Sequence, residues 1–481
     1  MKLSKLSRRT GVGLAAVALM IGLSACGGGG TTTTPSSDTG TGAAPATSST
    51  STSTGGGGGG GAACDIPVKK ANVPQVTVWA WYPAFDKIVN MFNDKHDDVQ
   101  ICWSNVGQGG GEYTKFTTAV EAGTGAPDVV MLEFDTLNAY TVRDALVDLT
   151  QYGINDIKSN FTDGAWKDAS SGAGVYAVPV DAGPVGMLVR QDIFDKYNVK
   201  VPTTWAEFEQ AGKDLKAAGF TGYITNFAPN ASNGMLSMYE QANGGPSNFA
   251  FDSTKPTNLG IKFNTDATKK VSEYWGNLVK EGLVDTKDAN TTDWTTAMLN
   301  GTYATYTPAA AWAWGYLQSS TEAGSTAIWK AYPIPQWDSA KPIQVNIGGS
   351  TFAVTKQSKQ PELAAKAAMG IYGDMESWQS GVADAALFPT YVPMLTSDGF
   401  KNQQYPFFNN QKINADVFLP AAQGYTGVVY LPFTPYLYDQ MAQLNAQVAQ
   451  GQLAGGDMPD KLQQILVQYG KDQGFTVSEN V

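Results

Sequence analysis

Histidine and cysteine are almost absent from this chain of 481 residues, which contains one histidine and three cysteines. A Cys/His zinc site needs about four such ligands, and a Ser-His-Asp triad or a Cys-His pair needs a histidine beside the nucleophile. The one histidine, His96, lies in a polar stretch at 93–98 that is typical of a solvated turn. We therefore expect no catalytic centre and no metal site of these kinds.

Phosphate-binding and dinucleotide-binding motifs are missing as well. The glycine-rich run at 107–111 has neither the lysine of a P-loop nor the spacing of a dinucleotide fingerprint. We expect no cofactor.

Positive charge is scarce, with 32 Lys and Arg against 43 Asp and Glu and a net charge of −11. Loss of residues 1–25 would remove four cations and no acid, which brings the net charge to about −15. A chain this acidic is a poor partner for the phosphate backbone, so we expect no nucleic acid partner.

The apolar segment at 11–23 is too short to span a bilayer, which needs about 20 residues. Four cations precede it: Lys2, Lys5, Arg8 and Arg9. This pattern predicts an export signal at 1–25. The paired arginines hint at twin-arginine export, and the choice between that route and the general secretory route stays open.

The apolar segment ends in Leu-Ser-Ala-Cys at 23–26, which resembles the lipobox of bacterial lipoproteins. The resemblance implies that Cys26 is lipidated and becomes the new N-terminus; in the alternative, an ordinary secretory signal, Cys26 is incidental. Residues 27–63 are almost wholly Gly, Ser, Thr, Ala and Pro, so a flexible linker at 26–63 is expected, with a reach of roughly 35 Å. The chain is then anchored to the outer face of the cell membrane.

Cys64 and Cys102 remain when Cys26 is set aside. An even pair in an oxidising compartment favours a disulfide, and two free thiols are the alternative. Alkylation with and without reduction would distinguish the two by mass.

The residues after Cys64 begin with alternating strand and helix patterns. Strands are predicted at 75–81, 99–106 and 128–132, and helices at 85–92 and 113–122. Alternation of this kind predicts an α/β fold with a parallel sheet. About 417 residues are too many for one hydrophobic core and suggest two lobes.

The chain as a whole resembles the extracellular solute-binding proteins of ABC importers, in the carbohydrate-binding group that includes maltose-binding protein. Five stretches carry the resemblance in order: 122–130, 176–179, 192–205, 311–314 and 348–366. They resemble the loop into the third strand, the crossover between lobes, a helix pair, a tryptophan loop, and a return strand with its helix. The resemblance covers roughly 76–469.

The resemblance implies a two-lobed periplasmic-binding-protein-like α/β fold with a central cleft and an interlobe hinge. Lobe one would comprise 74–181 and 346–393, and lobe two 182–345 and 394–481. It further implies ABC transporter permease subunits as partners, and we expect a monomer.

Ligands of open parallel sheets bind beyond the carboxyl ends of the strands, so the residues that follow each strand are candidates. They are Trp81 and Tyr82 after the first strand, Gln108 after the second, Glu133 and Asp135 after the third, and Asp181 at the crossover. In the alternative interpretation the three acids only cap the helices that follow.

Twelve Trp and 21 Tyr favour a sugar ligand, because flat aromatic rings pack on the apolar faces of sugars. By the resemblance, Trp312 and Tyr438 fall at stacking positions, although the family often has tryptophan at the second. Trp314 and Trp205 are expected to be structural. Gly349 and Ser350 could offer backbone amides to a ligand or could belong to the hinge strand, and Asn226 and Asn230 are weaker candidates.

The leading hypothesis is therefore a membrane-tethered receptor that binds a carbohydrate and delivers it to an ABC importer, without being an enzyme. Three alternatives stay open: a receptor for a cationic or peptide solute, a surface glycoside hydrolase with two carboxylates about 5 to 10 Å apart, and an iron receptor. Sugar identity, length and linkage are not predictable from the sequence.

Overall fold

The computed structural model describes residues 64–245 and 247–479, which fall in the unit Gly59–Val481. The predicted signal peptide at 1–25, the predicted lipidation site Cys26 and the whole predicted linker at 26–63 lie outside the described residues. Within the described ranges, no helix is both long enough and apolar enough to cross a membrane.

The main sheet begins with the predicted alternation of strands and helices. Its first five elements are β1 (Gln75–Trp79), α1 (Phe85–Lys95), β2 (Gln100–Ser104), α2 (Gly110–Ala122) and β3 (Val129–Glu133). β1 pairs in parallel with both β2 and β3. Phe85, Ile88, Val89 and Phe92 form the buried face of α1 at helical spacing. The predicted β-α-β unit is confirmed, and none of its ends shifts by more than three residues.

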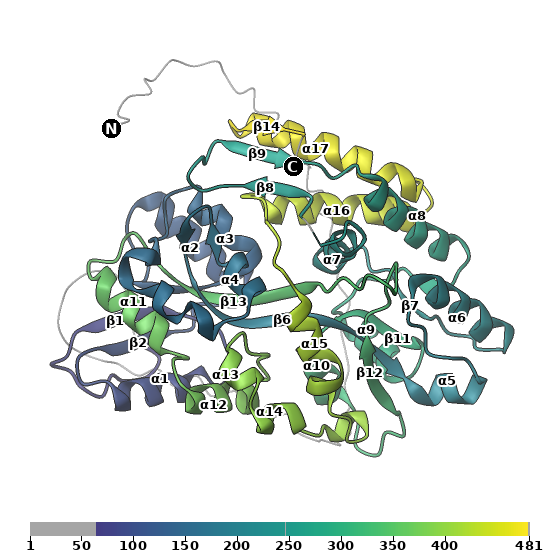
Figure 1. Ribbon diagram of the computed structural model, residues 1–481, viewed down its shortest axis with the longest axis horizontal. Helices are drawn as coiled ribbons and strands as arrows, with labels where there is room; N and C mark the ends of the chain where they lie inside the picture. The colour runs from purple at the N-terminus through teal and green to yellow at the C-terminus, as the bar shows by residue number, and fades with distance from the viewer. Residues whose placement is uncertain (1–63, 246, 480–481) are drawn as a thin grey trace, which may run out of the picture. The chain divides into compact units, whose positions relative to one another are not determined.

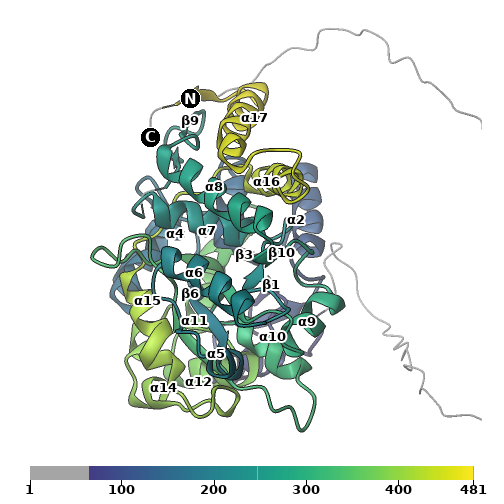
Figure 2. The ribbon, with the colours of Figure 1, turned by 90° about the vertical axis from the view of Figure 1, so that its right-hand side faces the viewer.

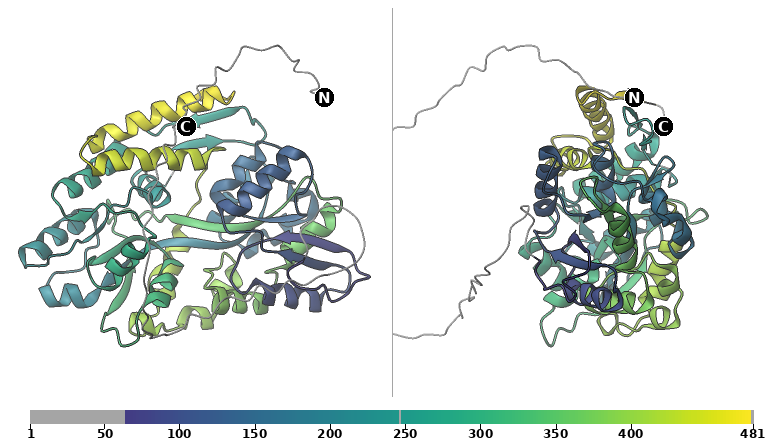
Figure 3. Two further views of the ribbon diagram at one scale, coloured as in Figure 1. Left: turned by 180° about the vertical axis from the view of Figure 1, so that it is seen from behind. Right: turned by 90° about the vertical axis from the view of Figure 1, so that its left-hand side faces the viewer.

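Two long strands, β6 (Val178–Arg190) and β13 (Asn346–Val354), form the middle of the sheet. The strand order is β11-β6-β13-β3-β1-β2, and β12 also pairs with β6. Residues 178–184 of β6 pair with β13, whereas residues 185–190 pair with β11 (Thr305–Ala310) and β12 (Trp329–Pro333). β6 therefore connects the part of the sheet around β1 and β2 with the part around β11 and β12, as Figures 1 and 3 show.

The sheet is mixed, so the prediction of a parallel sheet holds only for β1, β2 and β3. β13 runs antiparallel to β3 and to β6, and β11 and β12 run antiparallel to β6. The reason is topological: β6 carries the chain away from β3, and β13 brings it back in the opposite direction. A return strand beside an outgoing strand has to be antiparallel.

Both faces of the sheet are covered. In β3, Val129 and Met131 pack in one apolar cluster with Val78, while Val130 and Leu132 pack in a second cluster on the other face. Burial on both faces explains why this strand is a continuous apolar run rather than an alternating one.

The helices that follow β6 are α5 (Gln191–Tyr197) and α6 (Trp205–Ala217). Thr204 caps α6 as predicted, since its hydroxyl accepts the backbone N–H of Glu207 at 3.1 Å and the Glu207 carboxylate accepts that of Thr204 at 3.2 Å. Trp205 is 1% exposed and packs edge-on against Phe208 and Trp275. Its predicted structural role is consistent with this burial.

Four helices pack together at one side of the unit, where Figure 2 shows α17, α16 and α8 close to one another. They are α7 (Ser232–Ala242), α8 (Asp266–Lys280), α16 (Thr434–Ala449) and α17 (Met458–Asp472). A three-stranded sheet lies beside them, made of β8 (Phe249–Phe251), β9 (Asn258–Ile261) and β14 (Thr476–Ser478).

The remaining elements are short connections and covering helices. The helices are α3 (Phe134–Thr141), α4 (Asp163–Asp168), α9 (Thr292–Leu299), α10 (Ala313–Ser320), α11 (Pro361–Gly370), α12 (Met375–Ala385), α13 (Val392–Leu395), α14 (Asp398–Asn402) and α15 (Leu419–Gly424). The strands are β4 (Ser170–Ser171), β5 (Gly174–Val175), β7 (Thr225–Asn226) and β10 (Val284–Asp285). Short 3-10 or π turns occupy Leu149–Tyr152, Ile154–Asn160, Pro406–Phe408, Asn414–Phe418 and Gly455–Asp457.

The predicted lobe boundaries stay a prediction. The segment Asn414–Phe418 contacts β12 and β6, and α15 contacts β6 and α4. Residues after 393 therefore touch elements from both of the predicted lobes.

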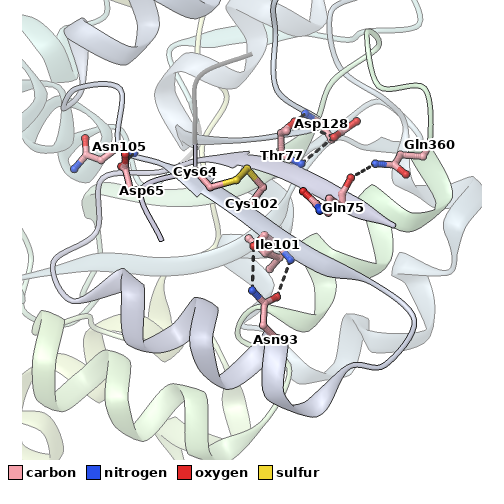
Figure 4. The surroundings of a disulfide bond; sticks show 10 residues. All are labelled: Cys64, Asp65, Gln75, Thr77, Asn93, Ile101, Cys102, Asn105, Asp128 and Gln360. Carbon is pink, nitrogen blue, oxygen red and sulfur yellow. Dashed lines mark hydrogen bonds between the residues drawn. A yellow bond between two sulfur atoms is a disulfide. The ribbon is translucent and has the colours of Figure 1, made fainter. Parts of the chain in front are cut away.

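Cys64 and Cys102 form a disulfide that joins the start of the described chain to β2 (Figure 4). The backbone N–H of Asp65 donates to the carbonyl of Trp103 at 2.8 Å, and its carboxylate accepts the N–H of Asn105 at 2.6 Å. The disulfide and these two hydrogen bonds together hold residues 64 and 65 along the side of β2.

Candidate functional site

A cavity of about 510 Å³ lies at the carboxyl ends of β1 and β3. Eight of the ten predicted ligand-binding residues line it: Trp81, Tyr82, Gln108, Glu133, Asp181, Trp312, Gly349 and Ser350. Asp135 and Tyr438 do not line it. The eight lining residues are spread over 270 positions of the chain. The parallel strands β1, β2 and β3 place Trp81, Tyr82, Gln108 and Glu133 at one edge of the sheet, and β6 and β13, which pair beside β3, bring Asp181, Gly349 and Ser350 next to them.

Three adjacent strands align Glu133, Ser350 and Asp181 in one row. Ser350 of β13 is the register partner of Glu133 in β3 and of Asp181 in β6. Neighbouring strands lie about 4.8 Å apart, and directly opposed side chains point to the same face of a sheet. Both carboxylates consequently reach the cavity, one on each side of the Ser350 hydroxyl.

Asp181 is buried and bound through one carboxylate oxygen. Its Oδ1 accepts the Ser350 backbone N–H at 3.1 Å, the Ser350 hydroxyl, and the Tyr82 hydroxyl at 3.4 Å. The Tyr82 and Ser350 hydroxyls also contact each other at 2.5 Å. This arrangement orients the carboxylate toward the cavity that it lines.

Gly349 is glycine because two chain segments approach closely there. It has a φ of +99°, and a Cβ at this position would lie 2.6 Å from the carbonyl oxygen of Asp181. The requirement for glycine at this position thus comes from the packing of β13 against β6. Its use as an amide donor to a ligand stays a prediction.

Asp135 and Tyr438 interact with each other beside the cavity. The Tyr438 hydroxyl donates to Oδ2 of Asp135 at 3.0 Å, which joins α16 to α3, and Tyr438 lines a small neighbouring pocket. Tyr113 links Glu133 to the aromatic lining, since its hydroxyl donates to Glu133 Oε2 at 3.0 Å and its ring packs edge-on against Trp81 at 5.6 Å.

The acids of the site hold their protons unusually strongly. Burial raises the pKa of Glu133 to about 8, and repulsion from Asp135 and Asp181 adds to this. Burial also raises the pKa of Asp135 and of Asp181 to about 6 each, against the hydrogen bonds from Tyr438 and Ser350 that lower them. Near neutral pH, this region therefore contains both carboxylates and carboxylic acids.

Stability is expected to fall as the pH rises from 5 to 8. Besides the site acids, burial raises the pKa of Asp168 to about 7, of Glu240 to about 8 and of Glu112 to about 9. The same groups titrate near pH 4 in an unfolded chain, so the native state binds more protons across this window. The contribution of each group is fully present below pH 4 and is lost as the pH rises through its folded pKa. Thermal unfolding at constant ionic strength should give a higher Tm at pH 5 than at pH 8.

Glu112 offers a matched pair of variants for this measurement. Both of its carboxylate oxygens are buried without a hydrogen-bond partner among the described residues, whereas Glu121 on the same helix is largely exposed. Glu112→Gln should flatten the Tm profile between pH 5 and 8, and Glu121→Gln should leave it unchanged. A Tm that increases with pH in the wild type would contradict this linkage.

Trp312 and Trp314 have different surroundings, although they lie two residues apart. Trp312 lines the main cavity and also an adjoining cavity of about 90 Å³, and its Nε1–H donates to the carbonyl of Ile347 at 3.4 Å. Trp314 packs against Tyr405 and Phe408 instead. Of the two, only Trp312 is placed to contact a ligand in these cavities.

Several lining residues were not predicted from the sequence. Asn233, Tyr316, Asp384 and Leu387 are among them. Tyr316 follows Trp312 by four positions, one helical turn, and is 68% exposed, so helical spacing from the predicted tryptophan was a usable signal. Asp384 comes from α12, whose sequence carries no such signal.

The weaker candidates Asn226 and Asn230 hold a loop. Their side-chain amides donate to the carbonyls of Lys287 and Ala289 at 3.1 and 3.0 Å. His96, predicted to be solvated, is partly buried and stacks on Phe92 at 4.0 Å. Among residues 64–245 and 247–479, no group of three or more His, Cys, Asp or Glu is arranged to hold a metal ion.

Comparison with known families gives one match that covers most of the chain. The sequence model of a family described as bacterial extracellular solute-binding protein matches residues 87–404. A lipoprotein of Streptomyces antibioticus, described as uncharacterized and located in the oleD 5′ region, is 30% identical over 157 residues. These are 30% of this chain and 33% of the relative, so the match spans about a third of that relative's length.

Solved structures share the fold over nearly all the described residues. The ABC transporter associated binding protein of Bifidobacterium animalis subsp. lactis Bl-04, in complex with β-1,6-galactobiose, is 29% identical with a TM-score of 0.69. The galacto-N-biose/lacto-N-biose I-binding protein of Bifidobacterium longum is 23% identical with a TM-score of 0.72. Each alignment covers 85% of this chain and 100% of the other. The two-lobed α/β fold is thereby confirmed.

Proposed function

Because the chain belongs to the family of bacterial extracellular solute-binding proteins, we propose that it is a receptor that binds a sugar or oligosaccharide in the cavity lined by Trp312 and delivers it to an ABC importer. The observation that carries the proposal is the combination of aromatic rings and hydroxyl-binding groups in one cavity. Trp81, Trp312 and Tyr316 offer flat apolar surfaces, while Glu133 and Asp181 offer acceptors.

The neighbouring structures support a sugar as the class of ligand. The Bifidobacterium animalis protein was solved with β-1,6-galactobiose and the Bifidobacterium longum protein with lacto-N-biose. The first shares 29% identity across its full length, which is the stronger of the two supports. On this proposal the ligand sits between two lobes that close by rotation about β6 and β13.

The attachment to the membrane is part of the same proposal. Cys26 anchors the receptor through its lipid, and residues 27–63 hold it near the permease at high local concentration. A lipoprotein relative supports this assignment. Metabolic labelling with a fatty acid should mark the wild type and leave a Cys26→Ser variant unlabelled and released into the medium.

Calorimetry across a panel of sugars tests the binding function. We expect one or more neutral oligosaccharides to bind reversibly with roughly micromolar affinity, about −8 kcal/mol, and no product to form on long incubation. If no sugar gave a binding signal and peptides or polyamines did, the sugar assignment would be refuted. Release of shorter sugars would instead identify a glycoside hydrolase.

A further inference from the structure

The cavity is lined by acidic side chains, two of which have no cationic partner among the described residues. Glu133 and Asp181 approach it from either side of Ser350, and Asp384 lies at its edge. No lysine, arginine or histidine is among the described residues that line it. Asp384 is compensated by Lys87 at 2.8 Å, so the two acids beside Ser350 are the uncompensated ones.

Asp181 has one oxygen left for a ligand. Three donors from other residues, the Ser350 N–H, the Ser350 hydroxyl and the Tyr82 hydroxyl, bind Oδ1, and the backbone N–H of Asp181 itself also donates to its carboxylate. Within the described part of the chain, no other residue donates a hydrogen bond to Oδ2. A carboxylate accepts about four hydrogen bonds, so Oδ2 of this buried residue retains capacity for a donor in the cavity.

Glu133 is in a similar position. Its Oε2 accepts the Tyr113 hydroxyl, and Oδ1 of Asp135, which repels the Glu133 carboxylate, is buried and has no hydrogen-bond partner among the described residues. The titratable groups that face these acids are themselves acids or tyrosines: Tyr82, Tyr113, Tyr372, Tyr438 and the carboxyl groups of one another. Burial raises the pKa of Glu133 to about 8, and repulsion from Asp135 and Asp181 adds to the increase. A cation bound nearby would lower this pKa again.

Resting on the proposed function, we propose that this cavity selects its sugar by charge: it binds a sugar with a protonated amine more tightly than the neutral sugar of the same skeleton, and it rejects the sugar carboxylate. Glu133 and Asp181 are the specificity-determining residues. An ammonium group between them donates to their oxygens and favours the ionised form of both acids, whereas a ligand carboxylate disfavours that form and repels the ionised Asp181.

The expected size follows from the type of hydrogen bond. A charge-assisted hydrogen bond is roughly twice as strong as a neutral one, and an ammonium group can form such bonds with both acids. Exchange of a hydroxyl for an ammonium should therefore strengthen binding by roughly tenfold.

Two matched series of probes test this. We would measure affinities at pH 6.5 for glucosamine, glucose and glucuronate, and for galactosamine, galactose and galacturonate, by calorimetry and ligand-observed NMR. In at least one series the amino sugar should bind about tenfold more tightly than the neutral sugar, and no uronate should bind. Titration of the amino sugar in phosphate and in Tris should reveal proton release, because the bound cation lowers the pKa of Glu133.

Glu133→Gln is the variant of choice, since it removes the charge and keeps the shape. It should reduce the preference for the amine to threefold or less and diminish proton release, while its affinity for the neutral sugar changes less. Asp398→Asn is the control, because Asp398 is exposed on α14 and does not line the cavity. It should retain the full preference and the proton release.

The outcomes separate this inference from the proposed function. If neutral sugars bind as tightly as amino sugars in both series, or only neutral oligosaccharides bind, selection by charge is wrong and the sugar receptor stands. If a uronate binds as well as its neutral partner, the inference also fails. If no sugar of any charge binds, both proposals are wrong.

Discussion

Trp312→Ala should weaken sugar binding by about 100-fold, which corresponds to 2–3 kcal/mol, measured by calorimetry with the tightest-binding member of the carbohydrate panel. The indole is half-buried and lines both the 510 Å³ cavity and the adjoining one of about 90 Å³. Removal of the ring eliminates the apolar surface for the face of a sugar and merges the two spaces. Large aromatic side chains in such positions dominate binding energies.

Two further variants distinguish a ligand contact from a packing defect. Trp312→Phe keeps a flat ring and should retain affinity to within about tenfold. Trp314→Ala removes a ring that packs on Tyr405 and Phe408, so it should lower Tm while leaving the affinity close to that of the wild type. Wild-type affinity in a folded Trp312→Ala protein would remove Trp312 from the site.

Loss of the disulfide should have the largest effect on stability. A double variant, Cys64→Ser with Cys102→Ser, is expected to lose about 3–4 kcal/mol of unfolding free energy in chemical denaturation, because the bond closes a separation of 38 residues. The loop contains β1, α1 and the first part of β2, and the disulfide restricts the unfolded chain across these segments. Intact-mass analysis after alkylation, with and without reductant, should show the bond in the wild type.

Cys26→Ser provides the control for this experiment, because it removes the third cysteine without touching the bonded pair. Its unfolding free energy should equal that of the wild type. Equal stability of the double variant would show that residues 64 and 65 contribute little to the fold, in spite of the backbone hydrogen bonds from Asp65 to β2.

Local patterns predicted the local structure well. The spacing of Phe85, Ile88, Val89 and Phe92 determines α1, and Thr204 with Glu207 determines the start of α6. Such signals are readable because they depend on residues within one or two turns of each other. The antiparallel direction of β13 was not readable, because it depends on the path of the chain through 155 residues between the end of β6 and the start of β13.

The site was predictable in part. Residues that follow strands were located by the rule that parallel strands bind ligands at their carboxyl ends, and most of them do line the cavity. Glu133 and Asp135 are two residues apart and are equally plausible ligand contacts from the sequence. Glu133 lines the cavity, whereas Asp135 accepts a hydrogen bond from Tyr438 of α16. Which of them faces a ligand depends on a helix some 300 residues later.

The sequence by itself determined the scarcity of histidine and cysteine, the acidic charge, the export and tether patterns, and the β-α-β start of the fold, because each depends on composition or on short spacing. Only the tertiary structure decided that Glu133, Ser350 and Asp181 stand in one row, that Trp312 rather than Trp314 lines the cavity, and that no cationic residue of the described ranges lines the cavity with the acids. The physical reason is that charge balance and enclosure are properties of groups brought together from distant segments. Whether a carboxylate has a cationic partner is decided only when the neighbouring strands have folded beside it.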